Sequence, residues 1–488
     1  MAGLCDRPRA KRDRSRPNLP IETHGYDTID YFRIDSRLGT ETDFALLLTA
    51  ARQRGIRVLL DGVFNHVGRT FQASQSRALQ PSELVRRTGN GDSVTFGGHD
   101  KLVTLDHEDE RVVDLVVDVM SHWLKRGIDG WRLDAAYAVP AQFWRRVIAR
   151  VRETYPDAYF IGEYIHADYP AVVRDAHLDS VTQYELWQGI WHSIEDHNLR
   201  ELDWALSRHN QFLHTFVPFT FIGNHDVTRI ASQITDPRHR AHAVVLLMTL
   251  GGTPAIYYGD ERGETGRKEA RVGGDDEIRP AYPAAPTDFT DPPNAVYSLH
   301  RELIGLRRRH SWLEQASSRT LTLTETQYVL EIRSNAFRLY VALNIGDGPC
   351  DVHVRPKQCS PAARAARTVA TGWTATDGPS SDRKTHAAAR RLSARSTARG
   401  PAPHAPNTLA ALPADQSSTL ITIVVGWRDG SDRGATERSF SVSTNYRFSR
   451  HRRLIRSGCQ RPHDSVERCV SERCLPVICL TCVQARAF

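Results

Sequence analysis

The sequence predicts an α/β protein whose main part is a (β/α)8 TIM barrel, followed by the start of a smaller β-domain. From about residue 21 to about residue 300, short apolar runs alternate with amphipathic stretches of helical character. Strands that alternate with helices at this spacing form βα units and a parallel sheet. The apolar runs are nearly continuous, which is typical of strands buried on both faces. Carboxylates follow several of these runs directly, and a barrel carries its active site at the C-terminal ends of its strands.

The expected elements follow one another in a regular order. The first strand run, 56–64, is rich in β-branched residues and follows a helical stretch at 42–55. The segment 110–127 places apolar residues near helical spacing and predicts a long amphipathic helix. The other expected strands are 128–134, 158–163, 180–186, 215–226 and 253–260, and the other expected helices are 140–156 and 241–252.

Changes in composition set the expected domain boundaries. The barrel is expected over 21–296, with an inserted loop region at 67–101, and the C-terminal β-sandwich is expected to start over 297–355. The remaining ranges, 1–20 and 356–488, are polar and basic, and the second is of low complexity. Such composition buries little apolar surface, so we expect the start to be non-native or disordered and the tail to be disordered or frameshifted.

The net charge of +7 does not predict a nucleic-acid partner. Lysine and arginine outnumber aspartate and glutamate mainly in 357–488, and that tail has no basic-aromatic interleaving and no recognisable module. The sequence contains no apolar run of roughly 18 residues, so no membrane partner is expected. The first residues contain no apolar stretch typical of a secretory signal. We therefore expect a cytoplasmic location, and the oligomeric state is left open.

Four carboxylates fall at the ends of successive strand runs: Asp61, Asp134, Glu163 and Asp226. Solvated acids at turns would explain one or two of them, but not four in four separate units. Arg132 precedes Asp134 by two residues, so on a strand both side chains point to the same face. A guanidinium in that place favours the ionised aspartate.

The motifs around these carboxylates resemble the conserved regions of the α-amylase superfamily, glycoside hydrolase family 13. Four motifs carry the resemblance, in order along the chain: DGVFNHVG (61–68), GIDGWRLDAAY (127–137), FIGEYIH (160–166) and FIGNHDVTR (221–229). Two further segments resemble the last barrel strand and the loop after the second strand of the family: GTPAIYYGDE (252–261) and ETHGYDTIDYFRID (22–35). The resemblance covers about 21–355 and implies that the first two barrel strands are absent, leaving an incomplete barrel with a truncated β-domain.

The resemblance implies a retaining glycosidase mechanism. It makes Asp134 the nucleophile, Glu163 the acid/base and Asp226 the third carboxylate, which holds sugar hydroxyls. The implied substrate-binding residues are Arg132, His66, His225 and Tyr26. Asn65 resembles a calcium ligand of many members, although some members need no such calcium. We therefore expect no cofactor and no metal, with calcium at Asn65 as the alternative.

Departures from the common pattern narrow the expected substrate. Ala135, Ala136 and Tyr137 stand where many α-amylases carry a Lys-His pair that contacts glucan on the leaving-group side. The segment KLVTL (101–105) resembles a region of cyclomaltodextrinase, neopullulanase and maltogenic enzymes. These features favour hydrolysis of malto-oligosaccharides, cyclodextrins or related α-glucans through a covalent intermediate. The alternatives are a transglycosylase or isomerase of the maltose or trehalose type, and an inactive fragment that only binds sugar.

Overall fold

The computed structural model describes most of the chain up to residue 348 and three strands beyond it. The described residues are 26–71, 83–271, 273–281, 294–335, 337–348, 420–428, 439–446 and 477–479. All of them except Gly348 belong to one compact unit. The expectation for residues 1–20 lies outside the described residues.

Six of the described strands run parallel to one another in the order that the sequence predicts. They are β1 (Arg57–Gly62), β5 (Gly130–Leu133), β6 (Tyr159–Gly162), β7 (Ser180–Val181), β8 (Phe219–Phe221) and β9 (Thr253–Ala255). The first four pair as neighbours in one sheet, and β8 pairs with β9. A bridge between Thr182 and Phe219 continues the parallel order from β7 to β8. Strand β15 (Val477–Cys479) pairs with the other edge of β1.

The last strands are shorter than the sequence predicts. The run 180–186 contributes only two strand residues, because the amphipathic helix α5 (Tyr184–Glu195) begins within it. Only the middle of 215–226 and the start of 253–260 are paired, and the residues that follow each strand form the loop at its C-terminal end. The loop after β8 carries His225 and Asp226, and the loop after β9 carries Arg279.

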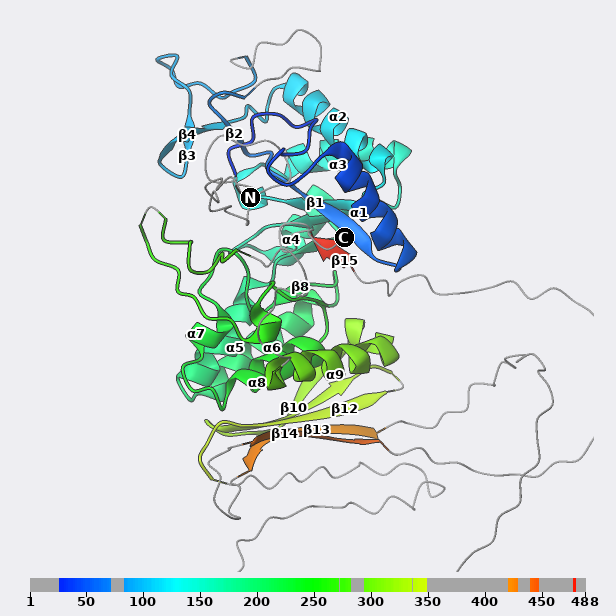
Figure 1. Ribbon diagram of the computed structural model, residues 1–488, viewed down its shortest axis with the longest axis vertical. Coiled ribbons are helices and arrows are strands. Elements are labelled where there is room, and N and C mark those ends of the chain that lie inside the picture. The colour runs from blue at the N-terminus through cyan, green and yellow to red at the C-terminus, as the bar shows by residue number, and fades with distance from the viewer. Residues whose placement is uncertain are drawn as a thin grey trace, which may run out of the picture. The chain divides into compact units, whose positions relative to one another are not determined.

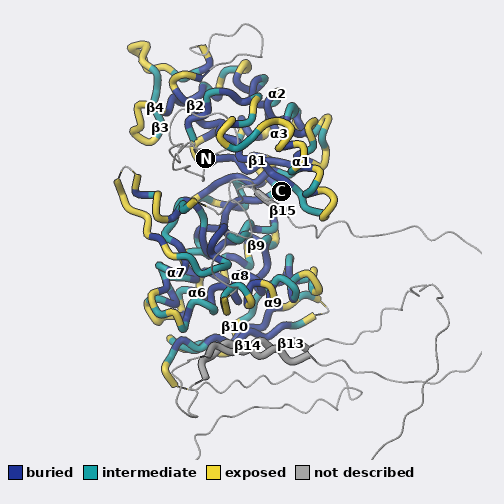
Figure 2. The backbone as a smooth tube through the Cα atoms, viewed as in Figure 1, coloured by how far each residue is buried: buried dark blue, intermediate teal, exposed yellow. Residues whose placement is uncertain are grey.

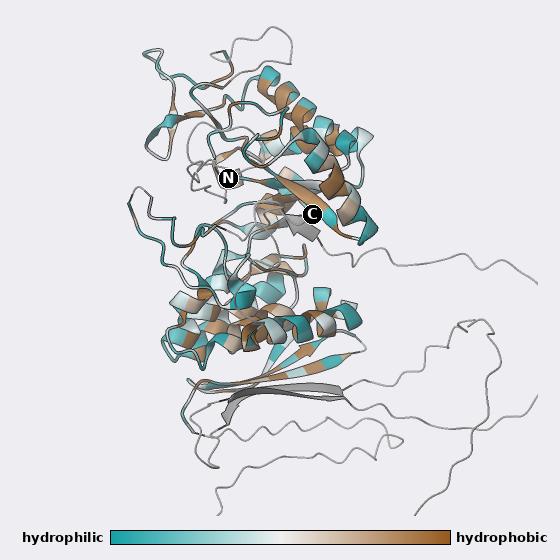
Figure 3. Ribbon diagram, viewed as in Figure 1, coloured by the Kyte–Doolittle hydropathy of each residue, from teal (hydrophilic) through white to brown (hydrophobic). Residues whose placement is uncertain are grey.

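Helices follow most of the strands, as expected for βα units (Figure 1). The helices before α5 are α1 (Glu41–Gln53), α2 (Glu110–Arg126), α3 (Ala141–Thr154) and α4 (Tyr169–Ala176). Those after it are α6 (Leu199–Phe212), α7 (Ile230–Gln233) and α8 (Arg240–Thr249). Helix α2 illustrates the local rules: Asp109 caps its N-terminus, and Gly127 ends it with φ of 104°. Its apolar residues gather along one side, and Figure 3 shows brown and teal alternating around this helix.

The inserted region folds as a small antiparallel sheet. Its strands are β2 (His66–Gly68), β3 (Thr95–Phe96) and β4 (His99–Thr104), in the order β2-β4-β3. The amide of Leu105 donates to the carbonyl of Asn65 at 3.1 Å, which ties the end of the insert to the loop after β1. The insert therefore lies beside the C-terminal end of the first described barrel strand.

The β-domain follows helix α9 (Ala295–Arg309). Its strands β10 (Ser317–Leu323), β11 (Gln327–Arg333) and β12 (Arg338–Asn344) are antiparallel, and β13 (Leu420–Arg428) and β14 (Ser439–Tyr446) extend the same sheet. Strands β13, β14 and β15 fall in the range that was expected to be disordered or frameshifted, and for the rest of that range the expectation stays a prediction. The apolar, β-branched run at the start of β13 pairs residue by residue with β12. The other tail residues lie outside the described part of the chain.

Two large apolar clusters form the core. One contains the fully buried Trp123, Trp131 and Trp144 and packs α1, α2 and α3 against β1, β5 and β6. The other joins α5, α6, α8 and α9 to the inner face of β10–β12. Figure 2 shows β1 in dark blue, and β5, β6, β11 and β12 are likewise mostly buried, whereas β10 is partly exposed. Among the described residues, no helix is long and apolar enough to cross a membrane; the cytoplasmic location stays a prediction.

Candidate active site

The parallel register brings the sequence-predicted carboxylates to one end of the sheet. Asp61 on β1 lies directly beside Arg132 on β5 in the strand pairing. The ladder continues past the strand ends, where the amide of Asp134 donates to Gly62 and the amide of Glu163 donates to Leu133, at 3.0 and 2.9 Å. Three carboxylates from three neighbouring strands therefore lie at the same level of the sheet.

The guanidinium of Arg132 joins these three carboxylates. Its Nη1 donates to Asp61 Oδ1 at 2.9 Å and to Asp134 Oδ1 at 2.8 Å. Its Nη2 lies 3.1 Å from Glu163 Oε2. Burial alone would lower the pKa of Arg132, but the surrounding carboxylates raise it well above its usual value. The arginine is therefore a fixed positive charge, and both Asp134 and Glu163 lie within reach of its two terminal nitrogens.

Glu163 has a second donor from the chain beside Asp134. The backbone amide of Ala135 donates to Glu163 Oε2 at 2.8 Å. Ala135 has φ of 44°, in the left-handed region that residues other than glycine seldom occupy. Burial raises the pKa of Glu163, against the opposing effect of Arg132 and the amide of Ala135. A carboxyl group with a raised pKa holds its proton more readily, as a general acid must.

Asp61 and Asp134 are also buried, and burial is the main influence on both. Burial raises the pKa of Asp134, while Arg132 opposes that rise. For Asp61, burial and the neighbouring Asp134 raise the pKa to about 7, again against Arg132. Asp61 has no exposed surface, so it contacts Arg132 rather than a ligand. Asp61 is therefore a structural partner of the arginine.

Asp226 has the opposite electrostatic environment. Burial would raise its pKa, but His225, Arg279 and Arg132 together hold that pKa well below its usual range. His225 Nε2 lies 2.9 Å from Asp226 Oδ2, and Arg279 Nη2 lies 2.9 Å from Asp226 Oδ1. Its side chain is 28% exposed, more than those of Asp134 and Glu163. Asp226 therefore stays ionised, and its side chain is accessible to a ligand.

Tyr26, His66 and His225 lie together, as the sequence predicts. His225 Nε2 is hydrogen-bonded to the Tyr26 hydroxyl, and their rings are nearly parallel with centroids 5.6 Å apart. His66 Nε2 lies 3.0 Å from the Tyr26 carbonyl oxygen, which can only accept, so this nitrogen carries the hydrogen. Phe96 of the insert stacks on His66 with centroids 4.8 Å apart. The sequence reasoning missed Phe96, which no motif marks.

Arg279 is the more important residue that the sequence reasoning missed. It lies 53 positions beyond Asp226, in the loop that follows β9, and an isolated arginine in a polar loop gives no spacing signal. Tyr184 was also missed: its hydroxyl accepts from Asn224 Nδ2 at 3.0 Å, next to the loop of Asp226. Both contacts come from tertiary folding of loops and not from strand periodicity.

The calcium alternative at Asn65 stays a prediction. The side-chain nitrogen of Asn65 lies 3.0 Å from His66 Nδ1 and so can orient that ring. Within the described ranges, no group of three or more His, Cys, Asp and Glu side chains is arranged to hold a metal ion. Nothing in the residue set therefore adds support for a metal at this place.

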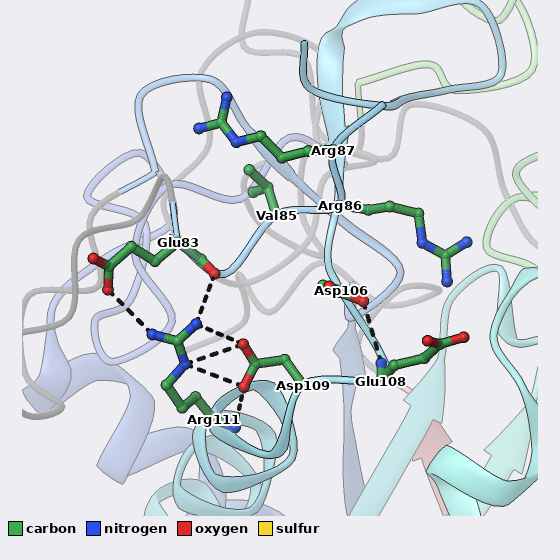
Figure 4. Close-up of a pocket in the computed structure, with 8 residues that line it drawn as sticks. All are labelled: Glu83, Val85, Arg86, Arg87, Asp106, Glu108, Asp109 and Arg111. Carbon is green, nitrogen blue, oxygen red and sulfur yellow. Dashed lines mark hydrogen bonds and ion pairs between the residues drawn. The ribbon is translucent and has the colours of Figure 1, made fainter. Parts of the chain in front are cut away.

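A wide hollow beside the insert is not part of this carboxylate cluster. It is lined by Glu83, Val85, Arg86, Arg87, Asp106, Glu108, Asp109 and Arg111. Figure 4 shows Arg111 there, with its guanidinium held between Glu83 and Asp109. These three charged side chains partly neutralise one another.

Comparison with known families gives an independent result for the same region. The family described as "Alpha amylase, catalytic domain" matches residues 17–85 and 94–343. A cyclomaltodextrinase of a Bacillus species is 31% identical over 323 residues, covering 61% of this chain and 55% of that protein. Neopullulanase 2 of Thermoactinomyces vulgaris is 30% identical over 317 residues, covering 61% and 52%. The chain thus spans about half the length of the curated relatives it matches.

Solved structures agree on the fold. A cyclomaltodextrinase structure superposes with a TM-score of 0.56 at 26% identity, covering 67% of this chain and 59% of that chain. The structure of an α-amylase from H. orenii gives a TM-score of 0.61 at 21% identity, covering 70% and 81%. The second likeness supports the barrel fold alone. That the first two barrel strands are absent stays a prediction.

Proposed function

Because the chain belongs to the α-amylase family, we propose that it is a retaining glycoside hydrolase that cleaves α-glucosidic bonds in malto-oligosaccharides, cyclodextrins or related α-glucans. The observation that carries the proposal is the shared guanidinium of Arg132, which contacts both Asp134 and Glu163. Retaining glycosidases need two carboxyl groups about 5–5.5 Å apart across the scissile bond. Two carboxylates on one guanidinium are held on the same side of the sheet and close to one another, as that chemistry requires.

In the first step, Glu163 gives its proton to the glycosidic oxygen as Asp134 attacks the anomeric carbon. The bond to the leaving sugar breaks, and a covalent glycosyl ester forms on Asp134. In the second step, the glutamate carboxylate takes a proton from water, whose oxygen attacks the anomeric carbon and releases Asp134. The raised pKa of Glu163 suits the first role, and Arg132 favours Asp134 as a carboxylate.

Asp226 supports this chemistry from the sugar-binding side. We assign it the role of accepting hydrogen bonds from sugar hydroxyls, because its pKa is held low and its side chain is partly exposed. His66, His225 and Tyr26 join it as contacts to the same sugar ring. The polar edge formed by Tyr26 and His225 lies directly against Asp226, which suits hydroxyl groups that are close neighbours on one ring.

The substrate class rests on the relatives and on the sequence around the site. Relatives that the chain matches at about 30% identity are named cyclomaltodextrinase, maltogenic α-amylase and neopullulanase. Transglycosylation is the second candidate, since the covalent intermediate is the same and only the acceptor differs. One observation favours transglycosylation as this second candidate. Tyr137, next to Glu163, is 45% exposed and so offers an apolar ring to an acceptor sugar.

The test is product analysis with the full chain on maltotriose and on a cyclodextrin. Hydrolysis gives glucose, maltose and linear maltodextrins, whereas transfer gives sugars longer than the substrate. Asp134→Asn and Glu163→Gln serve as controls, because both keep side-chain volume and remove one chemical role each. No turnover of either substrate by the folded wild-type chain would overturn the proposal and favour a protein that only binds sugar.

A further inference from the structure

One arginine outside all of the sequence motifs contacts the carboxylate of Asp226. We propose that Arg279 is a positioning residue for Asp226, which it holds in the orientation that receives the sugar during bond cleavage. The inference rests on the proposed function and adds a residue and a loop to the machinery of the same site. Two observations support this inference: the contacts of the Arg279 guanidinium, and the hydrogen bonds that anchor the backbone on both sides of Arg279.

Arg279 binds both the side chain of Asp226 and the backbone next to it. Its Nη2 donates to Asp226 Oδ1 at 2.9 Å, and its Nε donates to the carbonyl of His225 at 2.8 Å. The planar guanidinium thus fixes the carboxylate relative to its own main chain. Because His225 Nε2 holds the other carboxylate oxygen at 2.9 Å, rotation of the carboxylate would break a contact on either side.

The backbone around Arg279 is anchored on both sides. The hydroxyl of Tyr257 donates to the carbonyl of Ile278 at 3.0 Å, and the hydroxyl of Tyr258 donates to the carbonyl of Pro280 at 2.7 Å. These two tyrosines follow β9 and are buried. The arginine therefore projects from a short segment fixed to the barrel, which distinguishes it from a surface side chain that happens to meet a carboxylate.

A second carboxylate orients the guanidinium itself. Asp275 Oδ2 lies 2.8 Å from Arg279 Nη2, and the arginine side chain is only 11% exposed. Burial acts to lower the pKa of Arg279, but Asp226, Tyr26 and Asp275 together raise it above its usual value. The result is a chain of contacts from the barrel to Asp226 through the loop that follows β9.

The position of Asp226 matters because its two oxygens are already engaged. Each carboxylate oxygen has two lone-pair sites, so each retains one for a sugar hydroxyl. These remaining lone-pair sites face the bound sugar only while Arg279 and His225 fix the orientation of the Asp226 carboxylate. A carboxylate free to turn would bind the sugar in several orientations, and misplacement by about 1 Å can cost about 100-fold in rate.

Arg279 also contributes charge to the site. The groups that act on Asp226 from the surrounding elements are His225, Arg132, Arg279, Asp134 and Glu163, together with the tyrosines Tyr26, Tyr137 and Tyr184. Arg279 lowers the pKa of Asp134 as well as that of Asp226. Loss of the Arg279 charge therefore raises the pKa of both Asp134 and Asp226. The acidic limb of the pH–activity profile then moves to higher pH.

Two substitutions separate geometry from charge. Arg279→Gln removes the positive charge and the paired donors, while Arg279→Lys keeps the charge but cannot make the same planar contacts. For hydrolysis of maltotriose by the full chain, we expect kcat to fall by roughly 10- to 100-fold in Arg279→Gln with a smaller change in KM. Its acidic limb should shift to higher pH. Arg279→Lys should restore the acidic limb but only part of kcat.

The matched control is Arg271→Gln, which removes an exposed arginine of the same loop whose partner is Glu269. Its kcat and acidic limb should equal those of the wild type. Melting temperatures of all variants show whether any loss of rate is a loss of folding. Equal kcat and equal acidic limbs in wild type, Arg279→Gln and Arg279→Lys would overturn the inference, as would a fall in rate that only follows the fraction unfolded.

The wild type separates this inference from the proposed function. If the folded wild-type chain has no activity that Glu163→Gln abolishes, then the proposed function fails before Arg279 is tested. If the wild type is active and Glu163→Gln is not, then an unchanged Arg279→Gln rejects the role of Arg279 alone.

Discussion

The backbone amide of Ala135 donates a hydrogen bond of 2.8 Å to Glu163 Oε2, and this bond ties the segment after Asp134 to the carboxyl group across from it. Ala135 itself has φ of 44°, in the left-handed region that residues other than glycine seldom occupy. The bond therefore links the spacing of the two carboxyl groups to one unusual backbone conformation. It also favours the charged form of Glu163, against the burial that raises the pKa of that group.

The separate roles of the two carboxyl groups predict different responses to the leaving group. Glu163→Gln removes the proton donor, so cleavage of maltotriose should fall by roughly 100-fold or more. An aryl α-maltoside whose phenolate leaves without a proton should be cleaved in the first step at a rate much nearer to that of the wild type. Asp134→Asn should abolish cleavage of both substrates, because no covalent ester can form. Equal losses on both substrates in Glu163→Gln would contradict the assignment.

Arg132 predicts a large effect on stability. Substitution by methionine leaves the buried carboxylates of Asp61, Asp134 and Glu163 without their shared cation. Removal of one partner from such a buried group costs about 3–5 kcal/mol. Urea unfolding should detect this loss, while Arg126→Met, on the exposed end of α2, should change stability by less than about 1 kcal/mol. Near-equal stability of the two variants would show that the carboxylates do not depend on Arg132.

The pair of Arg229 and Asp260 predicts a pH dependence of stability. Burial raises the pKa of Asp260 from 3.8 to about 7, although Arg229 donates to it at 3.0 Å. A carboxyl group whose pKa is higher in the folded state binds more protons there than in the unfolded chain. Stability therefore falls as pH rises through the window between these two values.

Asp260→Asn removes this proton-linked contribution and keeps an oxygen for Arg229. Its unfolding free energy should decline less between pH 4 and pH 7 than that of the wild type, measured by chemical denaturation at several pH values. Parallel stability curves for the two proteins would mean that Asp260 stays ionised in the folded state.

Tyr137 predicts the balance between hydrolysis and transfer. Its amide donates to the carbonyl of Glu163 at 3.2 Å, and its exposed side chain stands on the segment just after the proposed nucleophile. Tyr137→Ala removes an apolar face from an acceptor sugar, so we expect a several-fold lower ratio of transfer products to hydrolysis products from maltotriose. Tyr137→Phe should retain the ratio of the wild type. An unchanged ratio in Tyr137→Ala would place the acceptor elsewhere.

Residues on strands could be predicted from the sequence, because strand periodicity and strand ends are local properties. Asp61, Arg132, Asp134 and Glu163 all fall at the same end of neighbouring strands, and the structure brings them together as predicted. The strand order also followed from the alternation of apolar runs and helices. These features depend on residues close together in the chain.

Residues on loops could not be predicted in the same way. Arg279 meets Asp226 only because Tyr257 and Tyr258 fix the intervening loop, and none of these contacts leaves a periodic pattern. The bond between Ala135 and Glu163 joins two loop-end residues of neighbouring strands, and the left-handed φ of Ala135 leaves no sign in the composition. The apolar run at the start of β13 stands out from the sequence around it, but its pairing with β12 joins segments far apart in the chain and leaves no local signal.

The most direct test of the account is the configuration of the first product, because it reports on Asp134 and Glu163 together. Hydrolysis of maltotriose by the full wild-type chain is followed by proton NMR, fast enough to precede mutarotation. The account predicts that the α-anomer of the newly formed reducing end appears first and the β-anomer grows only later. First appearance of the β-anomer would contradict the retaining mechanism and the role of Asp134 as nucleophile.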